Sequence, residues 1–140
     1  MSLIFESNFY AFGFYVALNA LIMLILGILV VRARVTTRTD IGDGGLPEMA
    51  GPLRAHGNNT EYVPMALLLL WALASVPPSA SIWVMHGAGA TLTIGRICHA
   101  LGLSQSTGPG TLRLVGTMLT WISFIIGIVG VFYLVFFGQA

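Results

Sequence analysis

Four long segments rich in apolar residues constrain the fold of this chain more than any other feature. They cover residues 9–35, 54–76, 80–103 and 111–137. A helix needs about 20 apolar residues to cross a bilayer core. The chain has 140 residues, 56% hydrophobic and 8% charged, whereas a soluble domain carries about 25% charged residues. The sequence therefore predicts one domain over residues 1–140, an all-α membrane protein built as a four-transmembrane-helix bundle.

The second of these segments begins with polar residues. Its apolar run, from Tyr62 to Val76, is too short to span a bilayer alone, so the helix is expected to begin near Arg54. A helix advances about 100° per residue, which places Arg54, Asn58 and Glu61 on one stripe. Charged groups at membrane depth are costly and usually face the bundle interior or a cavity. The stripe is either an internal ion pair, with Arg54 neutralising Glu61, or part of a binding site.

The arginines predict the orientation of the chain in the membrane. All six fall on the side of the loop at about 36–53 and of the connection before the fourth segment: Arg32, Arg34, Arg38, Arg54, Arg96 and Arg113. Under the positive-inside rule this side is cytoplasmic, and both termini lie on the other side. Simple anchoring at the membrane surface accounts for Arg34 and Arg38. In a bacterium, this topology predicts an inner-membrane protein whose site faces the cytoplasm.

Further polar residues occur at the cytoplasmic ends of the other segments. Arg96 and His99 are three residues apart and share one helix face. Arg32 closes the first segment and Arg113 opens the fourth. Together with the stripe they predict a mainly cationic pocket with Glu61 as one buried carboxylate. Such a pocket suits a small molecule with several carboxylates and an ammonium group, a pattern that glutathione and other zwitterionic peptides share.

Several classes of function are disfavoured by the same residues. The three histidines lack metal-ligand spacing, so no metal is expected. A net charge of +1 gives no sign of nucleic-acid binding. A small transporter or channel subunit is a rival reading, because intramembrane ions can line a path. The polar residues gather at one membrane face, however, and the outer half of the bundle is expected to be dry.

The stretch RAHGNNTEYVP, residues 54–64, resembles the R-A-H-x-N-x-x-E-x-x-P signature of the MAPEG family, the membrane-associated proteins in eicosanoid and glutathione metabolism. VRAR at residues 31–34 is similar to the basic end of the first helix in that family. GRICH at residues 95–99 is similar to its G-R-x-x-H motif, and Arg113 lies where the family has an arginine at the start of its fourth helix. The resemblance extends over nearly the whole chain and is closest to small bacterial members related to microsomal glutathione transferases.

This resemblance implies a homotrimer of four-helix bundles that binds glutathione as co-substrate between neighbouring subunits. By position, the glutathione-binding residues would be Arg32, Arg54, Asn58, Glu61, Arg96 and His99. Arg113 would be the catalytic residue and would hold the sulfur as thiolate. The implied activity is a membrane-bound glutathione transferase that conjugates small hydrophobic electrophiles, with glutathione peroxidase activity as a variant. The implied partners are a second and third copy of the chain, glutathione, the electrophile and membrane lipid, with no nucleic acid.

Three positions depart from relatives in this family. Gly57 replaces an arginine of the mammalian prostaglandin-forming relative, Leu103 replaces a tyrosine that touches glutathione in many relatives, and Leu114 replaces a serine that follows the arginine of the fourth helix. An eicosanoid synthase is therefore not expected. The alternative is a non-catalytic glutathione- or thiol-binding membrane scaffold protein, in which the polar stripe only holds helices together.

Overall fold

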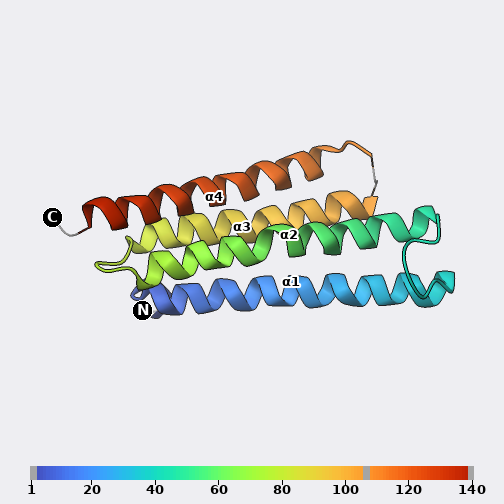
Figure 1. The fold of residues 1–140 in the computed structure, drawn as a ribbon, viewed down its shortest axis with the longest axis horizontal. Helices are drawn as coiled ribbons and strands as arrows, with labels where there is room; N and C mark the ends of the chain where they lie inside the picture. The colour runs from blue at the N-terminus through green and yellow to red at the C-terminus, as the bar shows by residue number, and fades with distance from the viewer. Residues whose placement is uncertain (1–2, 106–107, 139–140) are drawn as a thin grey trace.

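The computed structural model describes residues 3–105 and 108–138, and all regular structure in these ranges is helical. A short 3₁₀ helix, η1 (Leu3–Phe5), precedes four α-helices. These are α1 (Asn8–Thr37), α2 (Pro47–Ser75), α3 (Ile82–Gln105) and α4 (Thr111–Phe137). They form an elongated bundle in which the start of α1 and the end of α4 lie at the same end (Figure 1). The prediction of an all-α chain with four helices is confirmed for the described residues.

Two of the helices have the length and apolarity of membrane spans, namely α1 with 30 residues and α4 with 27. At 1.5 Å per residue they measure about 45 and 40 Å, which exceeds a hydrocarbon core of about 30 Å. Most of their side chains point away from the bundle, among them Leu24 on α1 and Ile125 on α4. Helices α2 and α3, with 29 and 24 residues, are long enough to cross but carry the polar stripe, Arg96 and His99. The four predicted spans thus divide into two strongly apolar helices and two polar-containing ones.

Helix α2 begins at Pro47, well before the start expected near Arg54, so the loop in front of it spans residues 38–46 rather than 36–53. Proline suits the first turn of a helix because its missing N–H has no partner there. Glu48, also in the first turn, interacts favourably with the helix dipole. The predicted start rested on span length alone and missed this initiation signal. The polar stripe therefore lies well inside α2.

The loop between α1 and α2 is held by Arg34. Its guanidinium donates hydrogen bonds to the backbone carbonyls of Thr39, Asp40 and Gly42 at 3.2, 3.1 and 3.2 Å. Arg38 takes a left-handed conformation, with φ of 55°, and its N–H bonds to the Arg34 carbonyl. Arg34 and Arg38 thus belong to the end of α1, at the end of the bundle that also holds the start of α4 (Figure 1).

The bundle interior contains two apolar clusters with polar residues between them along the helices. The larger cluster includes Leu70, Leu92 and other buried side chains toward the end with the termini. The smaller cluster, toward the arginine-rich end, has only three buried members, Leu26, Ala55 and Leu103. The buried apolar core is therefore larger at the terminal end than at the arginine-rich end.

The residues between the clusters include Asn19, Asn59 and Thr93, which we call the polar layer. The Asn19 amide donates to the Thr93 hydroxyl at 3.1 Å, and the Asn59 amide contacts the Met23 sulfur at 3.8 Å. The side-chain oxygens of Asn19 and Asn59 accept no hydrogen bond from any described residue. The polar layer separates the two apolar clusters. Buried amides require hydrogen-bond partners, so they interrupt the apolar packing.

The end of the bundle with the termini also contains polar side chains, which are hydrogen-bonded within the protein. The Tyr15 hydroxyl bonds to Nδ1 of His86 at 2.9 Å, and Nε2 of His86 bonds to the Ile4 carbonyl at 2.9 Å. Because a carbonyl only accepts, Nε2 carries the proton and Nδ1 accepts from the tyrosine. These hydrogen bonds connect η1 and α1 to α3. They give the Tyr15 hydroxyl and both ring nitrogens of His86 a partner.

Helices α3 and α4 approach each other closely at glycines. A Cβ added to Gly116 would lie 2.5 Å from the His99 nitrogen and 2.7 Å from the Gly95 carbonyl oxygen. A Cβ on Gly102 would lie 2.6 Å from the Arg113 nitrogen. These contacts bring the backbone of α4 directly against the α3 residues predicted to form the site.

Candidate functional site

Arg96 is the centre of a buried hydrogen-bond network that joins three helices. The residue is only 3% exposed. Its Nε and Nη2 donate to the Thr120 hydroxyl of α4 at 3.1 and 2.7 Å. Its Nη1 donates to the Asn58 side-chain oxygen of α2 at 2.8 Å. The guanidinium also lies 5.4 Å from the Tyr62 ring centroid, a cation–π contact. Arg96 therefore links α2, α3 and α4.

The network continues along the polar stripe of α2. With its oxygen turned toward Arg96, Asn58 donates its amide to Oε2 of Glu61 at 3.2 Å. Oε1 of Glu61 lies 3.7 Å from Nη1 of Arg54. The three residues share one face of α2, as their spacing predicted. Their hydrogen bonds and ion pair run in one direction, from the buried Arg96 to the surface.

Glu61 is not the buried carboxylate that was expected. Its side chain is 52% exposed and that of Arg54 is 61% exposed in the single chain. An ion pair of this exposure contributes little to stability, about 0–1 kcal/mol. The outer end of the network is therefore open to a ligand or to another subunit, while its inner end at Arg96 is closed.

His99 lies one turn from Arg96 on α3 and is 5% exposed. Three arginines, Arg96, Arg113 and Arg54, are each close enough to interact with it electrostatically. They come from three different helices, so the fold gathers the cationic residues that the sequence places far apart. The set carries more positive than negative charge, since Glu61 is its one acid, and it therefore favours an anionic ligand group.

Arg113 lies in the first turn of α4 and is partly buried. Its Nη1 donates to the Gly108 carbonyl at 3.4 Å. The residue lines an open groove of about 580 Å³ along α4, together with Thr117, Trp121 and neighbouring side chains. The groove therefore combines the Arg113 side chain with the apolar side chains of Leu114, Met118 and Trp121 on α4.

Arg32 lies apart from this network, with no side-chain hydrogen bond or ion pair to another predicted site residue among the described residues. It is exposed near the end of α1.

Asn59 and His56, which were expected to point away from the stripe, do face α1: Asn59 contacts Met23, and the His56 ring lies 3.9 Å from where a Gly27 Cβ would be. No group of three or more His, Cys, Asp or Glu side chains suited to a metal occurs within residues 3–105 and 108–138.

Sequence reasoning missed two partners of Arg96, namely Thr120 and Tyr62. Thr120 is fully buried and donates its own hydroxyl proton to the Gly116 carbonyl at 2.8 Å, so its oxygen is turned to accept from Arg96. The only signal in the sequence is that Thr120 lies two turns after Arg113 on the same helix. Arg96 itself lies deeper than expected, about 14 Å from the end of α3 at Gln105.

Replacing Thr120 with valine should destabilise the protein by about 1.5–3 kcal/mol, because two hydrogen bonds from a buried guanidinium lose their acceptor. Thermal unfolding in detergent would measure the effect, with Thr120→Ser as the matched control that keeps the hydroxyl. Equal unfolding temperatures for the valine and serine variants would show that Thr120 does not hold Arg96.

Comparison with known proteins identifies the family. A model of the MAPEG family matches residues 12–133. The chain is 38% identical over 88 residues to the inner membrane protein YecN of Escherichia coli K12, and equally to that of the O6:H1 strain. The match spans 63% of this chain and 66% of YecN, slightly less than two-thirds of the relative. A search of solved structures found no significant match. The chain is therefore an integral inner-membrane protein that belongs to the MAPEG family.

Proposed function

We propose that this protein is a glutathione transferase of the MAPEG type, which conjugates glutathione to small hydrophobic electrophiles at the membrane. Membership of the family supports a function connected with glutathione. The observation that carries the proposal is the network in which the buried Arg96 holds Asn58 and Asn58 binds Glu61, with the Glu61–Arg54 ion pair half exposed. Glutathione has two carboxylates, one ammonium group and one thiol, which this set of charges matches.

Each polar end of glutathione has a suitable partner in this arrangement. Glu61 would accept the γ-glutamyl ammonium, because it is the one acid of the network and is exposed. Arg54 and His99 would bind a carboxylate, and Asn58 would bind the peptide backbone. Arg96 is expected to act mainly by positioning, since it holds the Asn58 oxygen at 2.8 Å and lies beneath it. A ligand would thus replace the weak exposed ion pair and leave the buried contacts unchanged.

The chemistry requires a thiolate near neutral pH. A free thiol has a pKa of about 8.5 and is mostly protonated at pH 7, and the thiolate is the nucleophile. The Arg113 guanidinium beside the sulfur would stabilise the anion, and the thiol proton would pass to solvent. The sulfur then forms a bond to an electrophilic carbon, and the leaving group departs with its electron pair. With a lipid hydroperoxide, the same thiolate would attack the terminal peroxide oxygen and release the lipid alcohol, and a second glutathione would convert the resulting sulfenic acid to glutathione disulfide and water.

We further propose that the active form is a homotrimer. Arg32 is exposed on α1, away from the network of its own chain. The open side of the network, at Arg54 and Glu61, could be covered by a neighbouring subunit whose Arg32 completes the site. The apolar outer faces of α1 and α4 provide surfaces for such packing as well as for lipid.

Glutathione binding tests the proposal. Calorimetry with the purified protein in detergent should detect binding, and Glu61→Gln should weaken it about tenfold or more, because a charge-assisted hydrogen bond is worth about 1.5–3 kcal/mol. Glu48→Gln is the matched control, since it removes the same charge from α2 outside the network and should leave the affinity unchanged. Equal loss in both variants would remove Glu61 from the site.

One observation favours a second candidate, a non-catalytic membrane scaffold. Asn58, Glu61 and Arg54 already bind one another in the single chain, so the stripe is satisfied without a ligand. In that case millimolar glutathione would give no heat of binding. Glu61→Gln would then lower the unfolding temperature or dissociate the oligomer instead.

A further inference from the structure

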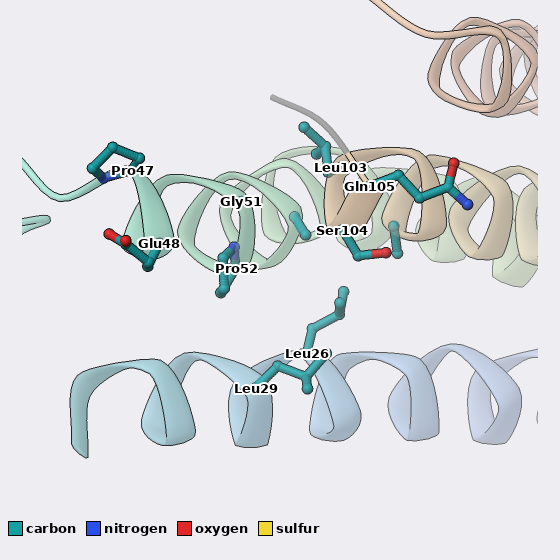
Figure 2. Close-up of a pocket in the computed structure, with 11 residues that line it drawn as sticks. Leu26, Leu29, Pro47, Glu48, Gly51, Pro52, Leu103, Ser104 and Gln105 are labelled. Carbon is teal, nitrogen blue, oxygen red and sulfur yellow. The ribbon is translucent and has the colours of Figure 1, made fainter. Parts of the chain in front are cut away.

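A separate cavity of about 450 Å³ lies between α1 and the α2–α3 pair at the arginine-rich end of the bundle. Leu26 and Leu29 project into it from α1, and Pro52 projects from α2 across the gap (Figure 2). The other side chains that line the deep part of the cavity, Ala55, Ala100 and Leu103, are small or apolar. Pockets of about 300–1,000 Å³ are typical of small-molecule sites, so this one can hold a ligand of that class.

The cavity exists because the inner end of the core is built from few and small side chains. Ala55 and Ala100 line it where larger residues would fill the space. The two alanines belong to the smaller apolar cluster or pack against it. The polar layer at Asn59, one turn deeper than Ala55 on α2, separates this space from the main core. An apolar guest is favoured here because it would bury the exposed hydrocarbon of the walls.

This cavity is distinct from the proposed glutathione site. The Leu103 carbonyl faces α2, 3.0 Å from where a Gly51 Cβ would be, and both residues line the cavity. The preceding residue, Gly102, instead faces α4 against the backbone of Arg113. Helix α3 therefore stands between the cavity and Arg113. None of the residues predicted to bind glutathione lines the cavity, although its lining includes Leu103, which replaces the glutathione-contacting tyrosine of many relatives.

The polar residues of the cavity define the head of its ligand. They are Glu48, Ser104 and Gln105, which lie at the start of α2 and the end of α3, at the arginine-rich end of the bundle. Among the described lining residues Glu48 alone is charged, and it is exposed. A cationic head at this level can stay at the water–lipid boundary while its chain enters the apolar part.

We propose that this cavity binds a single-chain alkylammonium amphiphile, with the ammonium at Glu48 and the alkyl chain between Leu26, Leu29 and Ala100. The ammonium donates hydrogen bonds to the Glu48 carboxylate, and the side-chain oxygens of Ser104 and Gln105 are available as further acceptors. An anionic chain of the same length is disfavoured because its head would meet the Glu48 carboxylate. This site goes beyond the proposed transferase activity and does not depend on it.

Photolabelling tests the proposal. The full-length protein in phosphatidylcholine nanodiscs is labelled with a dodecylamine that carries a diazirine near its chain end, in the absence of glutathione. Mass spectrometry should place the label on the inner faces of α1 and α3, and excess dodecylamine should compete at least tenfold better than dodecanoate. Label spread evenly over the exposed faces of α1 and α4, or equal competition by dodecanoate, would overturn the assignment.

Two variants test separately how the alkyl chain and the ammonium head of the ligand are bound. Ala100→Phe fills the cavity and should reduce labelling about tenfold, whereas Leu101→Phe, on the exposed side of the same turn, should not. Glu48→Gln should abolish the preference for dodecylamine over dodecanoate. Should Ala100→Phe fail to fold, Ser104→Trp at the mouth serves the same purpose. Undiminished labelling in a folded cavity-filling variant, or a preference that survives Glu48→Gln, would contradict the proposal.

Discussion

Arg113→Ala should lower kcat/KM for glutathione conjugation at pH 7 by about 100- to 1,000-fold, the cost expected when one electrostatic stabiliser of a reacting anion is removed. The positive charge of Arg113 favours the thiolate, so its removal should raise the pKa of bound glutathione toward the free-thiol value of about 8.5. Activity of the variant should therefore recover partly as the pH rises to 9. Turnover of a small aromatic electrophile, followed from pH 6 to 9, measures both effects.

The matched control is Arg34→Ala, which removes an arginine from the same end of the bundle but from the loop contacts of α1. It should keep the wild-type pH profile. A folded Arg113→Ala protein with unchanged turnover would exclude Arg113 from thiolate stabilisation. A uniform loss at every pH would instead indicate a role in binding or assembly.

Gly116→Val should cost about 3 kcal/mol or more of stability, at or beyond the upper end of the range for overpacking. A Cβ at this position would lie 2.5 and 2.7 Å from backbone atoms of His99 and Gly95, and neither can move without shifting α3. The separation of α3 from α4 would also stretch the Arg96–Thr120 hydrogen bonds. The unfolding temperature and the affinity for glutathione should both decrease. Both can be measured on the detergent-solubilised protein.

Gly13→Val is the control for this substitution. A Cβ at Gly13 meets no atom within 4 Å, so the variant should show only the difference in helix propensity between glycine and valine, which is less than about 1 kcal/mol and slightly favours valine. If both valine variants unfold at the same temperature, the close contact between α3 and α4 does not determine the stability of the bundle.

Local features of this chain were predictable because helix geometry depends on neighbours along the sequence. The four helices follow from apolar segment lengths, and the shared face of Arg54, Asn58 and Glu61 follows from the 100° step of a helix. The membership of the family follows from the residues around that stripe. Even here the start of α2 at Pro47 was missed, because span length was weighed above the helix-initiation signal.

Contacts between helices could not be predicted in the same way, since they depend on how the helices pack. The sequence by itself determined the four helices, the polar stripe and the set of charges that defines a ligand class. Only the tertiary structure decided that Arg96 is buried against Thr120 of α4, that Glu61 is half exposed, and that a cavity opens beside Ala55. The physical reason is that side-chain spacing within a helix is set by backbone hydrogen bonds, whereas the partners of a buried group are set by close packing across three helices.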